Sequence, residues 1–383
     1  MVILLGVSVL PTVGGEGGEF DLAAACARAL VSAGDTARLQ RALDKACQGR
    51  KVTVGVIGGS ITQGAAASKL EKNYGSLVAR WWRETFPKAT IEFVNAGIGA
   101  TGSNYGALRA QRDLLSRQPD FVIAEFAVND GNAKEFAETL EGLTRQILSQ
   151  PNQPALVFLF TMNNSGGNAQ EWHGKVGQHY ALPMNSFRDA LWPEIQARRL
   201  KWEDVEADMV HPNDRGHEYA AKFVTSFIEK VLKELPEGKA LPELKPVPPP
   251  LISDLFEHVT LLEADTLKPA KNDGWSFDAK NKCWKADKPG SVAEFDLEGQ
   301  VLLLMAFRIR GPMGKAKIQV DDLPAKTHDA WFDQTWGGWR ETLTLARGLK
   351  PGTHRVRVEL LPEKHPQSTG NEYRILALGA AGK

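Results

Sequence analysis

The chain has 383 residues, which is enough for two domains that each bury a hydrophobic core. Its formal net charge is +0, its pI is about 7.1 and charged residues make up 24% of it. This balance gives no basic excess for a nucleic-acid partner and no acidic tail. The three cysteines, Cys26, Cys47 and Cys283, are too few and too scattered for a disulfide framework, although Cys26 and Cys47 could pair if two N-terminal helices lie side by side.

No Cys-x-x-Cys or paired-histidine spacing indicates a metal site, and we expect neither a metal nor an organic cofactor. Met1 to Pro11 is an apolar run too short to span a bilayer. It favours a signal remnant of a secreted or periplasmic protein, with a start-site artefact of a cytoplasmic protein as the alternative. No other segment suggests a membrane partner, and the oligomeric state is not predictable from this sequence.

Residues 1–50 form an N-terminal helical segment, and residues 51–236 alternate between strand and helix patterns. The expected strands are 52–57, 90–95, 121–126, 155–161 and 182–185, and the expected helices are 74–85, 104–116, 134–149, 176–180 and 214–234. Alternation of this kind predicts an α/β domain with a parallel sheet covered by helices on both faces.

The composition changes near residue 236. Six prolines fall within fifteen residues, at positions 236, 242, 246, 248, 249 and 250, which indicates a stiff linker over residues 237–256. Residues 257–383 then lose the helical period and show short alternating runs at 258–262, 275–277, 291–297, 301–309, 316–320, 340–345, 355–361 and 373–378. Seven or eight short strands without helices predict a C-terminal β-sandwich.

The strand at 52–57 ends in Gly58-Gly59-Ser60, a tight turn that presents a serine. Acyl transfer by serine needs a nucleophile, a base, an orienting acid and an oxyanion hole. Ser60 is the candidate nucleophile. Taken alone, the turn also fits a strand exit with a capping serine.

Asp208-Met209-Val210-His211, followed by Pro212, places a carboxylate three residues before an imidazole. On one short turn the carboxylate can hold one ring nitrogen of His211 while the other faces a nucleophile, as in a catalytic triad. His217 is the rival base, although its place in the following helix favours packing or capping. His173 and His179 lie in a loop-helix region and could touch a substrate, but neither has an acid at a useful spacing.

Two other strand ends offer oxyanion donors. Asn129 follows the strand at 121–126, and loops after parallel strands are where such sheets place ligand groups. Its alternative role is an Asn-Asp turn with Asp130. Gly97 follows the strand at 90–95 and offers a backbone N–H without a side chain in the way.

A competing pattern lies in the same loop. Gly97, Gly99 and Gly102 match G-x-G-x-x-G between a strand and a helix, and Glu125 lies about where a ribose-binding acid is expected. This pattern would indicate an NAD(P)-binding oxidoreductase. It falls on the second strand of the unit rather than the first, and it leaves Ser60 and the Asp-x-x-His pair unexplained.

These blocks occur in the order typical of the SGNH (GDSL-type) hydrolases, which the chain resembles over roughly residues 50 to 235. The resemblance implies a flavodoxin-like three-layer α/β/α sandwich and a serine esterase that forms an acyl-enzyme. It assigns Ser60 as nucleophile, His211 as base and Asp208 as orienting acid. It assigns the oxyanion hole to the N–H groups of Ser60 and Gly97 and to the side chain of Asn129.

The chain departs from this family at two places. Gly59 stands where the family motif has an aspartate, so the turn lacks its own carboxylate and the resemblance to simple lipases weakens there. Ala127 stands two residues before Asn129, where the family often has a glycine.

Half of the ten tryptophans lie in residues 257–383, at positions 275, 284, 331, 336 and 339. Aromatic faces stack on the apolar faces of sugar rings, so Trp331 and Trp336 are candidate substrate-binding residues, with a place in the sandwich core as the alternative. Trp275 and Trp284 are expected in the core. Two-domain members of the family with a similar layout are often carbohydrate acetylesterases.

The sequence therefore predicts a serine esterase that removes small acyl groups, with acetyl expected, from an acylated carbohydrate. One alternative is a lipid or thioester acylhydrolase of the same family, which would need a long apolar groove. Alternatives of another class are the NAD(P)-binding oxidoreductase and a non-catalytic carbohydrate-binding protein.

Overall fold

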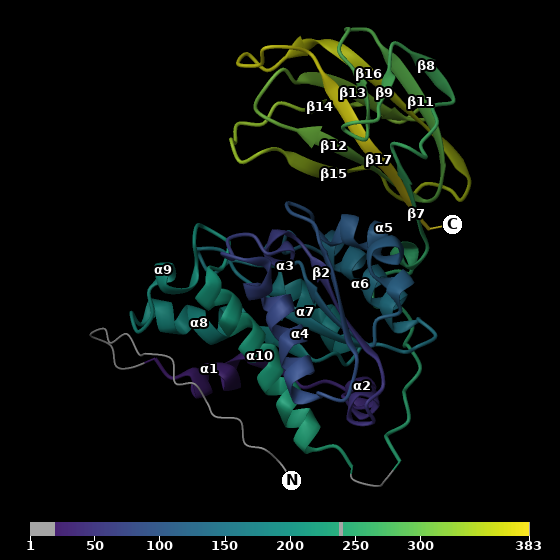
Figure 1. The fold of residues 1–383 in the computed structure, drawn as a ribbon. Helices are drawn as coiled ribbons and strands as arrows, with labels where there is room; N and C mark the ends of the chain where they lie inside the picture. The colour runs from purple at the N-terminus through teal and green to yellow at the C-terminus, as the bar shows by residue number, and fades with distance from the viewer. Residues whose placement is uncertain (1–19, 237–239, 383) are drawn as a thin grey trace.

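The computed structural model describes residues 20–236 and 240–382, so the apolar run Met1–Pro11 lies outside the described residues. An α/β unit and a unit of two β-sheets lie against each other, joined by an extended segment along one side (Figure 1). No helix in the described ranges has the length and apolarity needed to cross a membrane.

The α/β unit contains a six-stranded sheet in the order β1-β6-β5-β4-β2-β3. Its strands are β1 (Leu30–Ser32), β2 (Val52–Gly58), β3 (Ile91–Gly97), β4 (Phe121–Glu125), β5 (Ala155–Phe160) and β6 (Met184–Ser186). All pairs are parallel except β1 with β6. The parallel strands follow the flavodoxin order, in which the chain reverses direction across the sheet at β2 and ligands bind beside the strand ends there. The predicted flavodoxin-like sandwich is confirmed.

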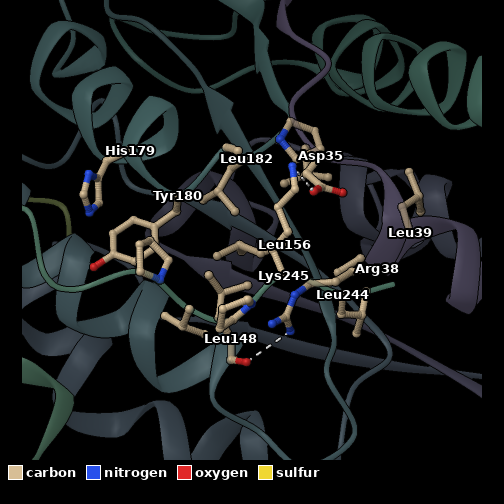
Figure 2. Close-up of a pocket in the computed structure, with 17 residues that line it drawn as sticks. Asp35, Arg38, Leu39, Leu148, Leu156, His179, Tyr180, Leu182, Leu244 and Lys245 are labelled. Atoms are coloured by element: carbon tan, nitrogen blue, oxygen red, sulfur yellow. Dashed lines mark hydrogen bonds and ion pairs between the residues drawn. The ribbon is translucent and has the colours of Figure 1, made fainter. Parts of the chain in front are cut away.

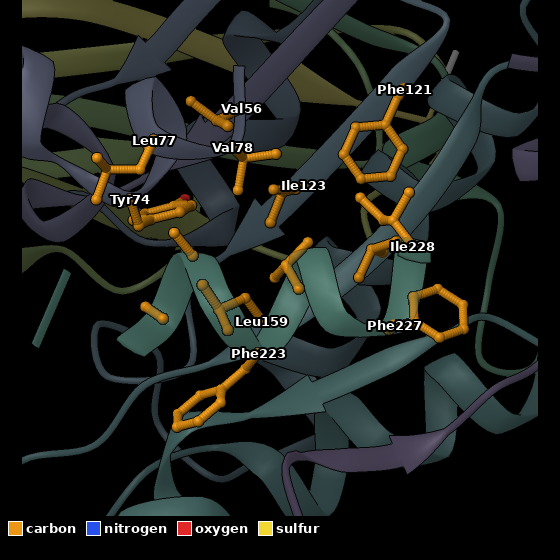
Figure 3. Packing of buried hydrophobic residues seen from close by; sticks show 14 of the residues in the cluster. Val56, Tyr74, Leu77, Val78, Phe121, Ile123, Leu159, Phe223, Phe227 and Ile228 are labelled. Atoms are coloured by element: carbon orange, nitrogen blue, oxygen red, sulfur yellow. The ribbon is translucent and has the colours of Figure 1, made fainter. Parts of the chain in front are cut away.

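Helices cover both faces of this sheet. One face carries α1 (Leu22–Ala29), α2 (Ala37–Cys47), α4 (Tyr74–Thr85), α8 (Phe187–Gln196) and α10 (Asp214–Lys233), and the other carries α5 (Ser103–Asp113), α6 (Lys134–Leu148) and α7 (Gln170–His179). Figure 3 shows Phe223, Phe227 and Ile228 of α10 packed with Ile123 and Leu159 of the central strands. Burial of these apolar side chains drives the layers together.

Some elements differ from those predicted. The sequence pattern does not indicate β1, α8 or the short helix α9 (Trp202–Val205), and α7 begins at Gln170 instead of residue 176. The α8 helix contains Pro193, which reads as a helix breaker. Cys26 and Cys47 are free, so the pairing considered between them is not formed.

The C-terminal unit contains two antiparallel sheets that enclose a common core, so the predicted β-sandwich is confirmed. One sheet has the order β15-β12-β17-β10-β9 with β7 paired to β17, and the other has the order β14-β13-β16-β11-β8. The strands are β7 (Val259–Glu263), β8 (Lys271–Asp273), β9 (Ser276–Asp278), β10 (Cys283–Ala286), β11 (Val292–Glu298), β12 (Val301–Arg308), β13 (Gly314–Val320), β14 (Lys326–Asp329), β15 (Trp339–Ala346), β16 (Thr353–Lys364) and β17 (Tyr373–Ala381).

The two units share a core. Leu302 and Leu304 of β12 face the inside of the sandwich, whereas Leu303 on the opposite face of the strand packs with residues of α5 and α6. Gly379 of β17 approaches α5 so closely that a Cβ atom there would lie 2.5 Å from Leu108 Cδ1. The β-sandwich is therefore packed firmly against the α/β unit.

The proline-rich segment lies along the α/β unit and is held by side chains from it. These anchors are Arg41 to Pro242 O (3.1 Å), Lys245 with Asp35 (3.2 Å), Arg145 to Pro248 O (2.7 Å) and His179 with Pro249 O (2.7 Å). Under the segment lies a pocket of about 230 Å³ with Leu156 and Leu182 in its wall (Figure 2). This pocket lies at the beginning of β5, and of the residues considered for substrate contact it is lined by His179 but by none of the candidate triad or oxyanion residues.

Glu141 fixes the end of this segment. Its fully buried carboxylate accepts hydrogen bonds from the backbone N–H groups of Leu251, Ile252 and Ser253 and from the hydroxyl of Tyr180. Three of these donors belong to the segment, so one buried carboxylate attaches three consecutive residues of it to the α/β unit.

Glu141→Ala should lower the free energy of unfolding by several kcal/mol, because each buried donor left without a partner costs about 1–3 kcal/mol. Urea unfolding measures this change. Glu243→Ala, an exposed change on the same segment, should have no measurable effect. Equal stabilities of the two variants would show that Glu141 does not anchor the segment.

Candidate active site

Ser60 lies at the carboxyl end of β2, where it begins the short helix α3 (Ser60–Gln63). The helix ends at Gly64, whose φ of 108° is readily adopted only by glycine. The side of α3 that faces the sheet is buried at Ile61 and Thr62, while Ser60 stays partly exposed. The turn therefore presents the hydroxyl of Ser60 at the strand end, at the place where ligands bind in sheets of this order.

A buried arginine that the sequence did not reveal fixes this strand end. The guanidinium of Arg109 on α5 is fully buried and donates to Gly58 O (3.0 Å) and Ala96 O (2.6 Å). Its charge is paired with Asp113 at 3.0 Å. Arg109 thus holds the ends of β2 and β3 together immediately before the Ser60 turn.

His211 lies between Ser60 and Asp208. Its Nε2 is 2.8 Å from Ser60 Oγ, and its Nδ1 is 2.8 Å from Asp208 Oδ2. Asp208 Oδ1 accepts the backbone N–H groups of Val210 (2.8 Å) and His211 (2.9 Å). Burial raises the pKa of Asp208, but these hydrogen bonds outweigh it and hold the pKa below its usual value. The structure therefore brings the three side chains together with the spacing of a catalytic triad.

Glu206 lies two residues before Asp208 and carries a buried carboxyl group. Neither of its side-chain oxygens has a hydrogen-bond partner among the described residues. Burial, with a smaller contribution from the charge of Asp208, raises the pKa of Glu206 to about 9. Glu206 is therefore neutral at neutral pH, and Asp208 carries the negative charge beside His211.

Asn129 lies against the backbone of the Ser60 turn. A Cβ atom on Gly59 would lie 2.1 Å from Asn129 Oδ1, so a side chain at position 59 would displace the amide. In this conformation Asn129 therefore occupies the space that a side chain before Ser60 would need. The contact also places the Asn129 side chain next to the nucleophile turn, as an oxyanion donor requires.

Gly97 does not offer a free N–H, so its assignment to the oxyanion hole is corrected. Its amide donates to Asn95 Oδ1 at 2.8 Å, and the residue is packed behind α3, where a Cβ atom would lie 2.2 Å from Gln63 N. The amide of Gly99 donates to Gln63 Oε1 at 2.7 Å. The N–H of Ala100 has no partner among the described residues. Ala100 has a φ of 57°, a strained value for a residue other than glycine, of a kind that often marks functional loops.

The other histidines have structural contacts. His217 is fully buried, its Nδ1 accepts the N–H of Tyr74 (3.3 Å) and its Nε2 is 3.2 Å from Ala65 O, which agrees with a packing role. His173 is buried and lies 3.1 Å from Asp130 Oδ2. The sequence offered no acid near His173 because Asp130 comes from a different strand end.

The G-x-G-x-x-G reading is wrong. The loop at residues 97–102 packs on α3 and on Asp130, and a Cβ atom on Gly102 would lie 2.4 Å from Asp130 Oδ1. Glu125 is fully buried and accepts hydrogen bonds from Thr62 and Thr161, so it cannot reach a ribose. The glycines serve close packing of the backbone, not a pyrophosphate.

The aromatic run of the β-sandwich reaches this loop. Trp339 donates its indole N–H to Ala100 O at 2.9 Å, a contact that the sequence did not predict. Trp336 is 55% exposed and packs edge-on against Phe332. Trp331 is buried in the sandwich and stacks on His365 at 3.7 Å, so its assignment to substrate binding is corrected. A cleft of about 530 Å³ lies between the units and is lined by Ala100, Thr101, Gly102, Asn104, Val128, Asn129, Phe136, Phe332, Trp336, Trp339, Arg340, Glu341 and Thr342.

Trp275 and Trp284 belong to the sandwich core or pack against it, as predicted. Within the described ranges, no group of three or more His, Cys, Asp or Glu side chains is arranged to hold a metal ion.

Comparison with known proteins identifies the family of this chain. Residues 56–219 match the GDSL-like Lipase/Acylhydrolase family. Two crystal structures of a two-domain esterase (CEX) active on acetylated mannans, one co-crystallized with mannopentaose, are similar at 33% identity, with TM-scores of 0.86 and 0.87, over 94% of this chain and 98% of theirs. Among curated proteins there is no match.

The chain belongs to the GDSL-like lipase/acylhydrolase (SGNH) family. It is a carboxylic ester hydrolase with the two-unit architecture of its similar structures.

Glu206→Gln should increase stability more at alkaline than at acidic pH. Because the pKa of about 9 in the folded state lies above the ordinary value of 4.5, the folded state binds more protons between these values and stability falls as the pH rises through them. Each pKa unit corresponds to about 1.4 kcal/mol. Melting temperatures of variant and parent at pH 5 and pH 8.5 measure the effect.

The exposed change Glu203→Gln is the matched control and should give the same small difference at both pH values. If the Glu206→Gln difference were also independent of pH, the Glu206 carboxyl would not be neutral in the folded protein.

Proposed function

We propose that this protein is a serine esterase that removes acetyl groups from acetylated carbohydrates, with acetylated mannans as the first class to test. The single observation that carries the proposal is the continuous contact from Ser60 Oγ through His211 to Asp208, with both links at 2.8 Å. No metal or organic cofactor takes part in the proposed reaction.

In the acylation step, Ser60 Oγ attacks the ester carbonyl carbon while His211 Nε2 takes the hydroxyl proton. Asp208 accepts the Nδ1–H bond and stabilises the imidazolium. The tetrahedral intermediate collapses as the bond to the sugar oxygen breaks, and His211 gives its proton to that leaving oxygen. The products are an acetyl-Ser60 ester and a free sugar hydroxyl.

In the deacylation step, His211 takes a proton from water, whose oxygen attacks the acetyl carbonyl. Collapse of the second intermediate breaks the bond to Ser60 Oγ, which recovers its proton from His211 and releases acetic acid. Both intermediates carry a negative oxygen. We assign its donors to the N–H of Ser60, the amide of Asn129 and the N–H of Ala100. Ala100 takes the place of Gly97, whose N–H is bonded to Asn95.

The cleft lining favours a carbohydrate over a long acyl chain. Exposed Trp336 and the neighbouring Trp339 offer aromatic faces, while Asn104, Arg340 and Glu341 supply polar groups in the same wall. Sugars need both kinds of contact, because their C–H faces are apolar and their hydroxyls form hydrogen bonds. A lipid or thioester substrate would need a mainly apolar groove, so we rank it second. The intact Ser60 contacts weigh against a purely carbohydrate-binding protein.

The similarity to the esterase CEX, which is active on acetylated mannans, supports the same assignment. We further propose residues 51–236 as the catalytic domain, 237–256 as the linker and 257–383 as a β-sandwich that completes the substrate cleft. The prediction of export rests on Met1–Pro11 alone.

Ser60→Ala should abolish hydrolysis of a small aryl acetate without unfolding the protein, because loss of a triad serine costs about a million-fold in kcat. Steady-state kinetics with circular dichroism check both points. Ser116→Ala, at an exposed serine far from the turn in sequence, should keep the parent activity. A folded Ser60→Ala variant with even a tenth of the activity would exclude Ser60 as the nucleophile.

Trp336→Ala should raise KM for an acetylated mannan about 2- to 10-fold and leave kinetics on a small aryl acetate unchanged. This range corresponds to the loss of one aromatic stacking face, about 0.5–1.5 kcal/mol. Acetate release from the polymer and aryl alcohol release from the small ester give the two values.

The buried Trp331 in the same run provides the contrast. Trp331→Ala should lower the melting temperature, because its large side chain leaves a cavity in the sandwich. If Trp336→Ala affected both substrates equally, Trp336 would support the fold rather than bind the glycan.

A further inference from the structure

A carboxylate lies buried beneath the Ser60 turn and has no place in the proposed reaction. Glu125 is the last residue of β4 and is paired in register with Gly58, the last residue of β2. Its side chain is fully buried. Its partners in the described residues are two hydroxyl groups, Thr161 Oγ1 at 2.6 Å and Thr62 Oγ1 at 3.3 Å.

Thr62 connects this carboxylate to the nucleophile turn. It lies in α3, two residues after Ser60, and is itself fully buried. Its hydroxyl is also 2.7 Å from the hydroxyl of Tyr74 on α4. A Cβ atom on Gly58 would lie 2.1 Å from Thr62 Oγ1, so the hydroxyl rests directly on the strand end. The contact chain therefore runs from β4 through Thr62 into the helix that carries Ser60.

The turn carries no acidic residue of its own. Gly59 stands immediately before Ser60, and a side chain there would meet Asn129. Within the described residues, Glu125 carries the only carboxylate that is hydrogen-bonded to a residue of α3, through the hydroxyl of Thr62. A buried carboxylate is costly unless hydrogen bonds compensate it, so its presence here calls for a role beyond packing.

We propose that Glu125 is a positioning residue, which holds the α3 turn through Thr62 and thereby keeps Ser60 Oγ at its distance from His211. The inference rests on the proposed role of Ser60 as nucleophile. Glu125 does not touch substrate, and its effect reaches the reaction only through the placement of Ser60. A misplacement of this kind is expensive, because reacting atoms must be aligned to well within 1 Å.

The charge of Glu125 adds a pH-dependent element. Burial raises the pKa of Glu125 to about 7, the bonds from Thr161 and Thr62 oppose this shift, and the charge of Asp130 adds to it. On the surrounding elements, Tyr74 of α4 is bonded to Thr62 and its pKa is raised mainly by burial and further by the charge of Glu125, Arg109 of α5 donates to the register partner Gly58, and His173 of α7 is bonded to Asp130. Above about pH 7 the ionised carboxylate accepts both hydroxyl bonds; below it, the protonated group accepts more weakly and the turn is held less firmly.

The first test removes the link and then restores it. Thr62→Val should lower kcat on a small aryl acetate about 10- to 100-fold with KM changed less than about twofold, because alignment is lost while binding is kept. Thr62→Ser, which keeps the hydroxyl, should recover most of kcat. Thr144→Val is the control and should keep the parent kcat, because this equally buried hydroxyl on α6 bonds, among the described residues, only to Leu140 O.

The second test removes the charge, and it decides the matter if Thr62→Val does not fold. The pH profile of kcat should need two ionisations in the parent protein, and Glu125→Gln should lose the one near pH 7, with kcat lowered at pH 8.

Parent-like kcat and profile in Glu125→Gln would overturn the inference. So would a folded Thr62→Val variant with parent kcat, or a loss that Thr62→Ser does not restore. If Ser60→Ala stays active, the proposed function itself fails; if only Ser60→Ala is inactive and the Thr62 and Glu125 variants match the parent, this inference alone fails.

Discussion

Close backbone packing at the end of β2 is the constraint on which the site depends. Gly58 leaves space for the hydroxyl of Thr62, and Gly59 leaves space for the amide of Asn129. A Cβ atom at either position would lie 2.1 Å from its neighbour, so Thr62 or Asn129 would have to move to accept it. Because both side chains approach so closely, residues from the ends of β2 and β4 meet around one serine. The two glycines thus create the space in which the site is assembled.

The β-sandwich is packed against the same α/β unit that carries the candidate site. β12 is buried on both faces, and Gly379 lets β17 approach Leu108 on α5, so the two units share one continuous apolar core. Sharing a core fixes the orientation of the sandwich, in contrast to a module on a flexible linker. The fixed orientation of the sandwich brings the indole of Trp339 to Ala100 O, beside the candidate oxyanion donors. A domain that donates a hydrogen bond to the loop of the candidate site contributes to its geometry as well as to the cleft between the two units.

The long elements of the α/β unit were predictable because their apolar residues recur with a helical or strand period, as in α4, which matches its predicted range. Elements that lack a period were missed. The helix α8 carries Pro193, and β8 and β14 are short strands at sheet edges with little buried surface. Propensity and pattern do not record which side chains a distant segment will cover.

The candidate-site residues divide in the same way, into those with a local sequence signal and those without one. Ser60, Asp208 and His211 were identifiable because a turn motif and a three-residue spacing are local signals. Gly97 was misassigned because its N–H is taken by Asn95, a contact that only the folded loop reveals. Trp331 and Trp336 are five residues apart in one aromatic run, and sequence alone could not tell which one faces the core.

Two buried carboxyl groups, Glu206 and Glu125, lie at opposite ends of the Ser60–His211–Asp208 contacts and differ in their charge near neutral pH. Glu206, neutral behind the Asp208 turn, adds no second negative charge that would compete for His211 or raise the pKa of Asp208 further. Glu125, under the Ser60 turn, has hydroxyl partners and changes charge near neutral pH. Both groups cost folding free energy when ionised, because burial removes their hydration. Groups of this kind are concentrated at functional sites, where a strained or costly environment sets the position and charge of the reacting side chains. In this protein both costly groups lie beside the catalytic candidates and not among them. His211, which lies between the two, is the group that we propose exchanges protons with the substrate.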